Sequence, residues 1–478
     1  WISKVGKRNN INAAEIYLLT GDLYYHQYNY LKAEEYYEKA KKLYNKFFDD
    51  KHPDYVKVIS KLSKVYYMKG ETKKAEETIN EAIDNYNLFI QDFFPSLSER
   101  EKTKFWNTIK NDFEFFNTLA LNRAKENKKM MEKVYNNALT TKAILLNSSI
   151  KIRQNIMSSN DKELIENYNK WISNKELLTQ ALSMTEDQLI ENGINPPQLA
   201  REAELLEKDL SLKSDAFKND GVKITWENIR SSLGPNEIAI EMVRFRHFDH
   251  VFTDSVIYAA LYVKNQKESP TPSVSLITNG KDLENKFFKS YRNSIIYKIN
   301  DHFSNAAYWE PIRKIAGNYA TIYLSADGVY NQINLEAIPT EDGKYVLDNS
   351  NIILVNNTKD IYLNKNKVAA PNENRVLMYG NPDFYLSASA TNQIADLPGT
   401  KKEIDELKKL LLMKGWIAQD FMDLSAKEDQ LKLIDNPRVF HIATHGFFRG
   451  SDDGKGQTTS IETNQNKMYD NPLLRTGL

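Results

Sequence analysis

The residues best suited to chemistry in this sequence lie near its carboxyl end, in the run Val439-Phe440-His441-Ile442-Ala443-Thr444-His445-Gly446. This apolar segment is short enough for a strand and ends in a histidine followed by a glycine. Continuous apolar runs are typical of strands buried on both faces of a parallel sheet, and α/β folds place their sites just past the carboxyl ends of such strands. We therefore expect His445 to be a catalytic imidazole, with Gly446 letting the backbone turn and approach a ligand.

The same two histidines allow two other interpretations. His441 and His445 have the four-residue spacing of a helical metal-binding pair, but position 442 is isoleucine, and the flanking residues favour a strand. On a strand the two rings would lie roughly 13 Å apart. That separation is too large for one ion, so we expect no metal site. Both histidines could instead be hydrogen-bonded core or turn residues, and for His441 we keep that interpretation.

Composition restricts the class of protein. Lysine and arginine total 64 and so do aspartate and glutamate, so the net charge of zero gives no electrostatic reason to expect a nucleic acid or an anionic membrane as partner. No apolar stretch approaches the roughly 20 residues that span a bilayer, and no signal peptide is visible. The absence of cysteine excludes disulfides and cysteine-type zinc sites. We expect a soluble cytoplasmic protein of about three domains that needs no cofactor. Because the first residue is Trp1, we expect a trimmed amino terminus.

An internal repeat occupies the first ninety residues. Five positions recur with an offset of 42, where Gly21, Tyr24, Ala33, Tyr37 and Ala40 correspond to Ser63, Tyr66, Ala75, Ile79 and Ala82. The small residues would let two antiparallel helices approach closely, with tyrosines filling the space between them. The pattern resembles the tetratricopeptide repeat, in the longer style of kinesin light chains, and Pro53 fits a helix start. The alternative is a generic pair of helical hairpins. Arrays of this kind need about three units, so further helices should complete the stack.

The rest of the chain changes pattern twice. Residues 91–222 have a helical pattern, and their aromatic residues Trp106, Phe113, Phe115 and Phe116 should face a core. From about residue 226, β-rich runs alternate with amphipathic ones. The expected strands are Glu237 to Val243, Val256 to Val263, Ser273 to Ile277, 320–325, 352–355, 375–380, 416–422 and 437–444, with helices over 281–316 and from Thr400 onward. The alternation from 375 to 446 predicts right-handed parallel units.

Six segments of the second half occur in the order seen in the CHAT family, whose caspase-like domains are often attached to tetratricopeptide repeats. They are Tyr323-Leu324-Ser325-Ala326-Asp327-Gly328, Asn334-Leu335-Glu336-Ala337-Ile338-Pro339, Tyr379-Gly380-Asn381-Pro382, Leu397-Pro398-Gly399-Thr400, His441-Ile442-Ala443-Thr444-His445-Gly446 and Asn471-Pro472-Leu473-Leu474-Arg475-Thr476-Gly477-Leu478. Asn334 stands where the family usually has proline. The resemblance covers roughly residues 225–478, and that to the repeats covers 14–90. The chain thus resembles a caspase- and separase-like CHAT protease with amino-terminal repeats.

The resemblance implies a fold of the α + α/β class, with a helical array followed by a caspase-like α/β domain that is incomplete at the carboxyl end. The implied domains are repeats at 1–90, a helical continuation at 91–222, a pseudo-protease-like first half at 223–370 and the catalytic half at 371–478. It also implies a cysteine endopeptidase in which His445 assists the thiol and Gly446 offers its N–H to the oxyanion. The family's cysteine lies on the next strand, so we expect it beyond Leu478.

The same resemblance suggests partners. The repeats would hold a protein substrate or a protein activator, and family members act as effectors in bacterial defence, so proteolysis would follow partner binding. The glycine-, serine- and asparagine-rich loop at about 449–470 has the composition of a mobile segment near the site. The competing hypothesis is a catalytically inactive scaffold in which the repeats bind proteins and the α/β domain is structural.

Overall fold

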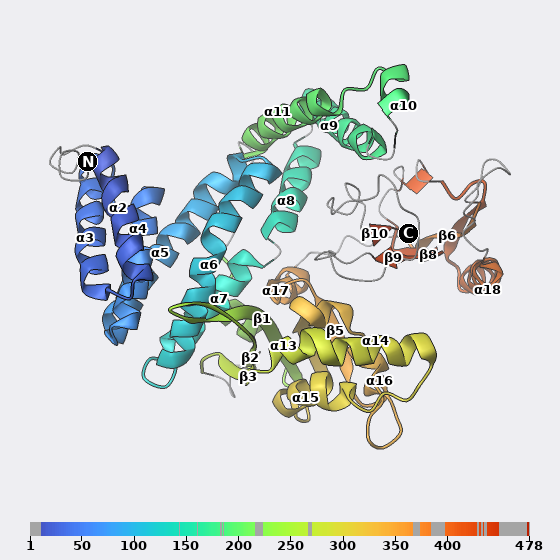
Figure 1. The fold of residues 1–478 in the computed structure, drawn as a ribbon. Helices are drawn as coiled ribbons and strands as arrows, with labels where there is room; N and C mark the ends of the chain where they lie inside the picture. The colour runs from blue at the N-terminus through green and yellow to red at the C-terminus, as the bar shows by residue number, and fades with distance from the viewer. Residues whose placement is uncertain are drawn as a thin grey trace. The chain divides into compact units, whose positions relative to one another are not determined.

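The computed structural model of the chain describes residues 11–142, 144–159, 161–181, 184, 186–215, 223–265, 270–366, 373–383, 397–427, 430–431, 434, 437–448 and 476–477. The chain divides into two compact units (Figure 1). Trp1–Trp171 and Ala203–Asn366 make up the first unit, and Ile172–Glu202 and Lys367–Leu478 make up the second.

The predicted repeats are two helical hairpins. Their helices are α2 (Ile11–His26), α3 (Tyr30–Phe47), α4 (Pro53–Met68) and α5 (Thr72–Phe93). The small residues act as predicted, because a Cβ on Gly21 would lie 2.4 Å from the Tyr37 ring. At the equivalent position of the second hairpin, the Ser63 hydroxyl donates to the carbonyl of Ala75 at 2.7 Å. The predicted helix start at Pro53 is confirmed.

Helices continue after the repeats, as the pattern predicted. They are α6 (Glu99–Arg123), α7 (Lys129–Thr141), α8 (Ile144–Ser158), α9 (Lys162–Ala181), α10 (Glu186–Glu191) and α11 (Pro196–Asp215). A capping box starts α6, since Ser98 and Glu101 each accept from the other's backbone N–H. Phe113, Phe115 and Phe116 are buried.

The first sheet belongs to the first unit and has the strand order β3-β2-β1-β4-β5. Its strands are β1 (Glu237–Asp249), β2 (Val251–Lys264), β3 (Ser273–Ile277), β4 (Thr321–Ser325) and β5 (Asn351–Val355). β1 pairs antiparallel with β2 and parallel with β4, which in turn pairs parallel with β5.

Helices cover both faces of this sheet, so apolar residues are buried on each. One face packs with α7 and with α12 (Trp226–Ser232) and α17 (Lys359–Lys365) in a core that continues into the repeats. The other face packs with α14 (Phe288–Tyr297) and α15 (Glu310–Ala316). The helical array and the first sheet therefore share one continuous apolar core.

Two expectations for this unit need correction. The helix predicted over 281–316 is interrupted. Its first part consists of α13 (Gly280–Asp282), η2 (Leu283–Phe287) and α14, which is capped by Lys298. Its second part consists of η3 (Asn305–Trp309) and α15. The cause is Lys298, whose φ of 51° is left-handed and cannot continue a helix. Strand β1 extends beyond the predicted end at Val243, and β2 begins before the predicted start at Val256. The cause is that their polar and aromatic ends pair with each other as a long hairpin.

The second unit contains a small parallel sheet of order β7-β6-β8. Its strands are β6 (Arg375–Pro382), β7 (Ile417–Asp423) and β8 (Val439–Ala443), and α18 (Pro398–Met413) joins β6 to β7. Ile404 of α18 packs on Val376, Met378 and Ala443. The predicted strands and the helix near Thr400 are confirmed. The alternation also predicted a helix between β7 and β8, where residues 428–429, 432–433 and 435–436 lie outside the described residues.

Candidate active site

The strand that carries the candidate histidine lies beside the middle strand of the small sheet. β8 pairs in parallel with β6, with Met378 opposite His441 and Gly380 opposite Ala443. Phe440 meets the Tyr379 ring edge-on at 5.6 Å on one face, while Ala443 is buried against α18 on the other. Alternation along the strand therefore directs His441 toward α18.

His445 follows the end of β8 by two residues and is half-buried, and Gly446 beside it is exposed. Neither residue is helical. The predicted position at the carboxyl end of a parallel strand is therefore where the structure places this imidazole. A group there is held by a rigid strand and still reaches solvent, which a proton-transfer catalyst requires.

The neighbouring strands end in polar residues with left-handed backbone. Asn381 follows Gly380 in β6 with φ 47°, and Asp423 ends β7 with φ 51°. Asn381 Nδ2 donates to Asp423 Oδ1 at 2.7 Å, and the Asn381 N–H donates to Thr400 Oγ1 at 3.1 Å. Because the carboxyl ends of parallel strands meet at one edge, these bonds shape the edge to which His445 belongs. Neither Asn381 nor Asp423 was predicted to have a role at this edge.

Close packing of α18 on β6 depends on a glycine. A Cβ on Gly380 would lie 2.5 Å from Ile404 Cγ1 and 3.4 Å from the Thr400 carbonyl oxygen. Two of the motifs quoted for the resemblance, Tyr379-Gly380-Asn381-Pro382 and Leu397-Pro398-Gly399-Thr400, are thus in direct contact. Both serve to fix the start of α18 against the end of β6.

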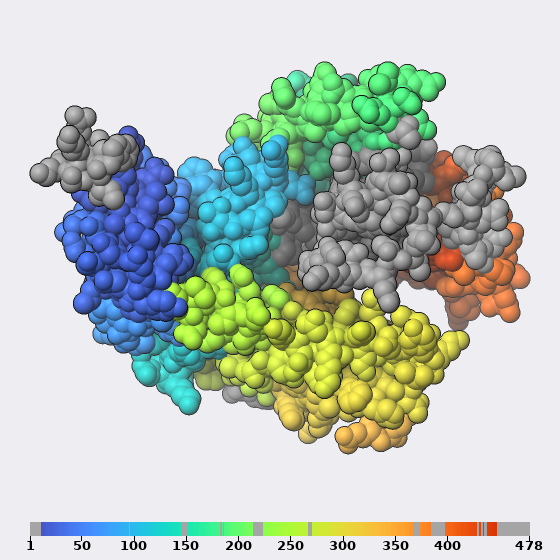
Figure 2. Space-filling view, viewed as in Figure 1, coloured from blue at the N-terminus to red at the C-terminus, as the bar shows by residue number. Residues whose placement is uncertain are grey.

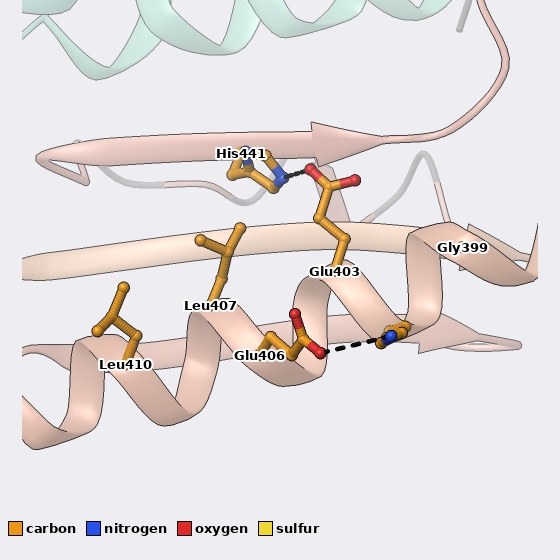
Figure 3. Close-up of a pocket in the computed structure, with 7 residues that line it drawn as sticks. Gly399, Glu403, Glu406, Leu407, Leu410 and His441 are labelled. Carbon is orange, nitrogen blue, oxygen red and sulfur yellow. Dashed lines mark hydrogen bonds and ion pairs between the residues drawn. The ribbon is translucent and has the colours of Figure 1, made fainter.

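His441 lines a separate, open pocket of about 630 Å³ between α18 and β8. Its Nε2 lies 2.9 Å from Glu403 Oε1 (Figure 3). The pocket also has a charged pair on α18, Lys402 and Glu406, with nitrogen and oxygen 3.8 Å apart. A paired, partly exposed histidine agrees with the hydrogen-bonded role that we kept for His441. The pocket lies along α18, and His445 does not line it.

A distant segment returns to the histidine loop. Phe447 and Phe448 form β9 and pair antiparallel with Gly477 and Thr476 of β10. The pairing begins next to Gly446, so the end of the sequence is brought beside the candidate site. The predicted loop at 449–470 lies outside the described residues, as do 471–475 and 478.

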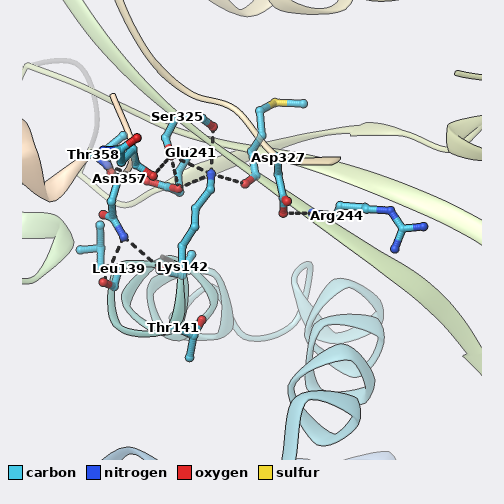
Figure 4. Close-up of polar contacts among 12 residues, drawn as sticks. Leu139, Thr141, Lys142, Glu241, Arg244, Ser325, Asp327, Asn357 and Thr358 are labelled. Atoms are coloured by element: carbon cyan, nitrogen blue, oxygen red, sulfur yellow. Dashed lines mark hydrogen bonds and ion pairs between the residues drawn. The ribbon is translucent and has the colours of Figure 1, made fainter. Parts of the chain in front are cut away.

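In the first sheet, a buried charge pair lies at the carboxyl end of β4. Lys142, which follows α7, places its Nζ 2.7 Å from Glu241 Oε1 on β1 and 2.7 Å from Ser325 Oγ on β4 (Figure 4). The Glu241 side chain is fully buried and also accepts from the backbone N–H and hydroxyl of Thr358, at 2.8 and 2.7 Å. A lysine from the helical region thus occupies the edge where an α/β sheet would otherwise open to a ligand.

Asp327 extends this polar cluster. It accepts from the backbone N–H groups of Arg244 and Gly328, each at 2.8 Å. Burial raises the pKa of the Asp327 carboxyl, although the charge of Lys142 and the two N–H donors act in the opposite direction. The whole cluster is tied to backbone, and its groups satisfy one another. Such an arrangement fixes the position of a helix relative to a sheet.

The repeats contact the tip of the long β1–β2 hairpin. His250, between the two strands, has φ 59° and stacks between Tyr25 and Tyr28 with ring centroids at 4.7 and 4.0 Å. The Tyr25 hydroxyl donates to the His250 carbonyl at 2.7 Å, and the Tyr30 hydroxyl lies 2.9 Å from Nδ1. Burial lowers the pKa of His250, and the neighbouring His26 lowers it further. The first helical hairpin of the array therefore binds the tip of the β1–β2 hairpin of its own chain.

The sequence pattern singled out His445 as a candidate, but it did not single out these polar residues. The only signal for the buried pair was Glu241, a carboxylate inside an otherwise apolar strand. Nothing marked Lys142, because lysines are frequent throughout the helical region. Among the residues that the structure describes, no group of three or more histidine, aspartate or glutamate side chains could hold a metal ion. None of the described helices has both the length and the apolar character needed to cross a bilayer.

Comparison with known families agrees with both resemblances. Residues 305–478 match the CHAT domain, and residues 12–87 match the tetratricopeptide repeat. The match to the CHAT domain begins after β3, so β1, β2 and β3 precede it. No curated protein matches the sequence significantly.

Proposed function

We propose that this chain is part of a caspase-like cysteine endopeptidase, because it joins tetratricopeptide repeats to a CHAT domain. The enzyme would act in the cytoplasm, cut a protein substrate and be regulated through its repeats. The 478 residues contain no cysteine, so the nucleophile would come from polypeptide outside them. What supports the proposal best is the place of His445, a half-buried imidazole just past the carboxyl end of a parallel strand within the segment that matches the CHAT domain.

In the proposed mechanism His445 takes the proton of the incoming thiol, and the thiolate attacks the scissile carbonyl. The backbone N–H of Gly446 and that of the cysteine would stabilise the oxyanion, and one such donor is worth about 3–4 kcal/mol in the transition state. His445 then gives its proton to the leaving amine. Water hydrolyses the acyl-enzyme and regenerates the thiol. Proton transfer in both directions suits an imidazole near neutral pH.

The geometry of β8 supports delivery of the thiol from an added strand. Within the described residues β8 pairs on one side only, with β6. Val439 and Phe440 expose about two fifths of their surface, as residues of an edge strand do (41 % and 40 %). A further parallel strand pairing with β8 would end at the same edge as His445, which would bring its terminal residue close to the imidazole.

The test uses the protein expressed from its full reading frame. The purified protein is incubated with a peptide library derived from a cellular proteome, and new termini are identified by mass spectrometry. We expect His445→Ala to lower the cleavage rate by about 10²- to 10⁴-fold, the usual contribution of a general acid–base.

His441→Gln is the matched control, because glutamine keeps a hydrogen bond to Glu403 and His441 takes no part in the mechanism. It should retain wild-type cleavage. If His445→Ala cuts as fast as the wild type, or if the full reading frame supplies no cysteine, the protease proposal is wrong.

A second candidate function is an inactive scaffold, which applies if the full reading frame supplies no cysteine. In that case the repeats would bind a protein and the α/β domain would only support them. The two functions differ in one result: a cellular effect of the full-length protein that survives His445→Ala favours the scaffold. In either function we propose that the tetratricopeptide repeats bind the protein partner, either an activator or a substrate.

A further inference from the structure

A group of exposed apolar side chains surrounds the carboxyl end of α14, a helix of the first unit that lies at the surface of the molecule (Figure 2). The group consists of Ile295, Ile296, Tyr297 and Ile299, and each exposes between 58 % and 69 % of its surface. Single exposed apolar residues are ordinary on proteins, but four of them within five positions mark an interaction site. We call this group the α14 tip.

Positive charge adjoins the tip. Lys286, Lys289, Arg292 and Lys298 are all exposed, and no acidic residue lies between positions 285 and 300. Lys289, Arg292 and Ile296 have the i, i+3, i+7 spacing that places side chains on one face of a helix. Among the described residues no ion pair is found for the four basic side chains, and Lys286 and Arg292 lie over the rings of Phe287 and Phe288 at 5.4 and 6.0 Å. The face therefore runs from positive charge to apolar surface along the helix.

The tip is held firmly to the core. Tyr291 of α14 is buried, and its hydroxyl accepts from the Asn334 N–H at 3.0 Å. After the helix, the left-handed Lys298 turns the chain, and the Ile299 N–H closes on the Ser294 carbonyl at 3.1 Å. The apolar side chains are thus presented by a fixed turn and need no ordering before they meet a partner.

The flanking acidic residues Asp282, Glu284 and Asp301 offset only part of this charge. Glu284 pairs with Arg244 and accepts from the Tyr258 hydroxyl at 2.7 Å. Asp301 accepts from the N–H groups of Phe303 and Ser304, at 3.1 and 3.0 Å. Residues 282–301 hold four basic and three acidic residues, and Glu284 is neutralised by Arg244, so a net positive charge remains around the tip.

We propose that the α14 tip docks this protein on an anionic membrane surface. Apolar residues at the end of the helix would enter the boundary of the acyl chains, while Lys289 and Arg292 behind them would contact lipid phosphates. This order matches the layers of a lipid interface, with hydrocarbon inside and negative charge outside it. Net charge predicts no attraction for the chain as a whole, but binding at an interface depends on the local charge within about 10 Å.

The test measures co-sedimentation of the full-length protein with vesicles. One set is phosphatidylcholine alone, and the other is phosphatidylcholine mixed with phosphatidylglycerol. We expect binding to the mixed vesicles only, weakened by salt. Lys289→Glu combined with Arg292→Glu should lower the partition coefficient by at least about 30-fold. Ile296→Asp should also weaken binding, and lowering the salt concentration should not restore the binding that this variant loses.

Two matched controls separate a specific tip from general stickiness. Lys128→Glu with Lys129→Glu changes the same charge on another exposed segment, and Leu205→Asp changes an apolar residue of similar exposure, 64 %. Both should bind vesicles like the wild type, and circular dichroism should show all variants folded.

Several results would overturn the proposal. They are no binding of the wild type to mixed vesicles at low salt, equal losses in the control variants, and an unchanged partition coefficient for Ile296→Asp. Equal affinity for soluble polyglutamate would also overturn it, because the tip would then recognise acidic protein rather than lipid.

Discussion

Single residues in this chain show how strongly burial changes the effect of one charge or one methyl group. Lys142 and Lys133 lie on the same stretch of chain around α7, and both pair with a carboxylate. The partner of Lys142 is the fully buried Glu241, whereas the partner of Lys133 is Asp84, whose side chain is 63 % exposed. Sequence alone does not distinguish these two lysines, since the difference arises from what folds against them.

Lys142→Met should lower the free energy of unfolding by about 3–5 kcal/mol, because it leaves the Glu241 carboxylate buried without its counter-charge. Lys133→Met is the control and should cost no more than about 1 kcal/mol, since an exposed pair contributes little. Denaturant unfolding followed by circular dichroism measures both. Equal losses in the two variants would contradict the claim that the buried Glu241 depends more strongly on its lysine than the exposed Asp84 does.

Gly380→Ala should destabilise the second unit by about 1–3 kcal/mol, because the new methyl group collides with Ile404 and must push α18 away from β6. Gly399→Ala is the control within the same pair of motifs. A Cβ at Gly399 meets nothing within 4 Å, so this variant should be neutral or slightly stabilising. Thermal unfolding compares them, and a neutral Gly380→Ala would contradict the packing described above.

At the scale of elements, the alternation of apolar runs in the sequence predicted most of the strands of the five-stranded sheet and of the three-stranded sheet. Apolar runs bounded by turns located β1 to β8, because buried strands leave that signature in a sequence, but not the two-residue strands β9 and β10. The long ends of β1 and β2 were missed. Their polar residues alternate with aromatics that pack on helices far away in the chain, such as Phe248 with Phe115 at 4.8 Å. Local periodicity cannot report a contact of that kind.

The contact between the hairpin tip and the repeats should weaken in acid. The pKa of His250 in the folded protein is lower than the ordinary value of 6.5, so the unfolded chain binds more protons as the pH falls below that value. Stability from this contact is complete above about pH 6.5 and is lost as the pH falls toward the folded pKa. The wild-type melting temperature should therefore drop more than that of His250→Phe between about pH 7.5 and about pH 5.5.

His302→Phe is the control for that measurement, because His302 is exposed and takes no part in the contact. It should follow the wild type across the whole pH range. If His250→Phe also follows the wild type, the neutral imidazole contributes nothing to the contact between hairpin and repeats.

At the scale of the whole molecule, the sequence predicted an array followed by an α/β domain but not their shared core. The chain changes composition near residue 226, which suggested separate domains. In the structure the array packs on the first sheet through residues more than a hundred positions apart, as when the Phe248 N–H donates to Thr118 Oγ1 at 3.2 Å. Pairings of this range leave no trace in a single sequence.

Phe248→Ala tests whether the array and the first sheet unfold together. Its ring is buried among Tyr67, Phe115 and Phe252, so the truncation should cost about 3–5 kcal/mol. Hydrogen exchange should show amides of α4 and of β1 losing protection in parallel. Phe47→Ala, at a position that is 42 % exposed, is the control and should change little. Loss confined to the sheet would contradict a common core.

The central claim is that His445 activates a thiol, and the most direct measurement is the pH dependence of cysteine alkylation in the full-length protein. With His445 present, the nucleophile should react with iodoacetamide at a midpoint clearly below pH 8.5, the ordinary thiol value, and His445→Ala should return the midpoint to about pH 8.5. His441→Gln should leave it where the wild type has it. Identical midpoints with and without His445 would contradict the account.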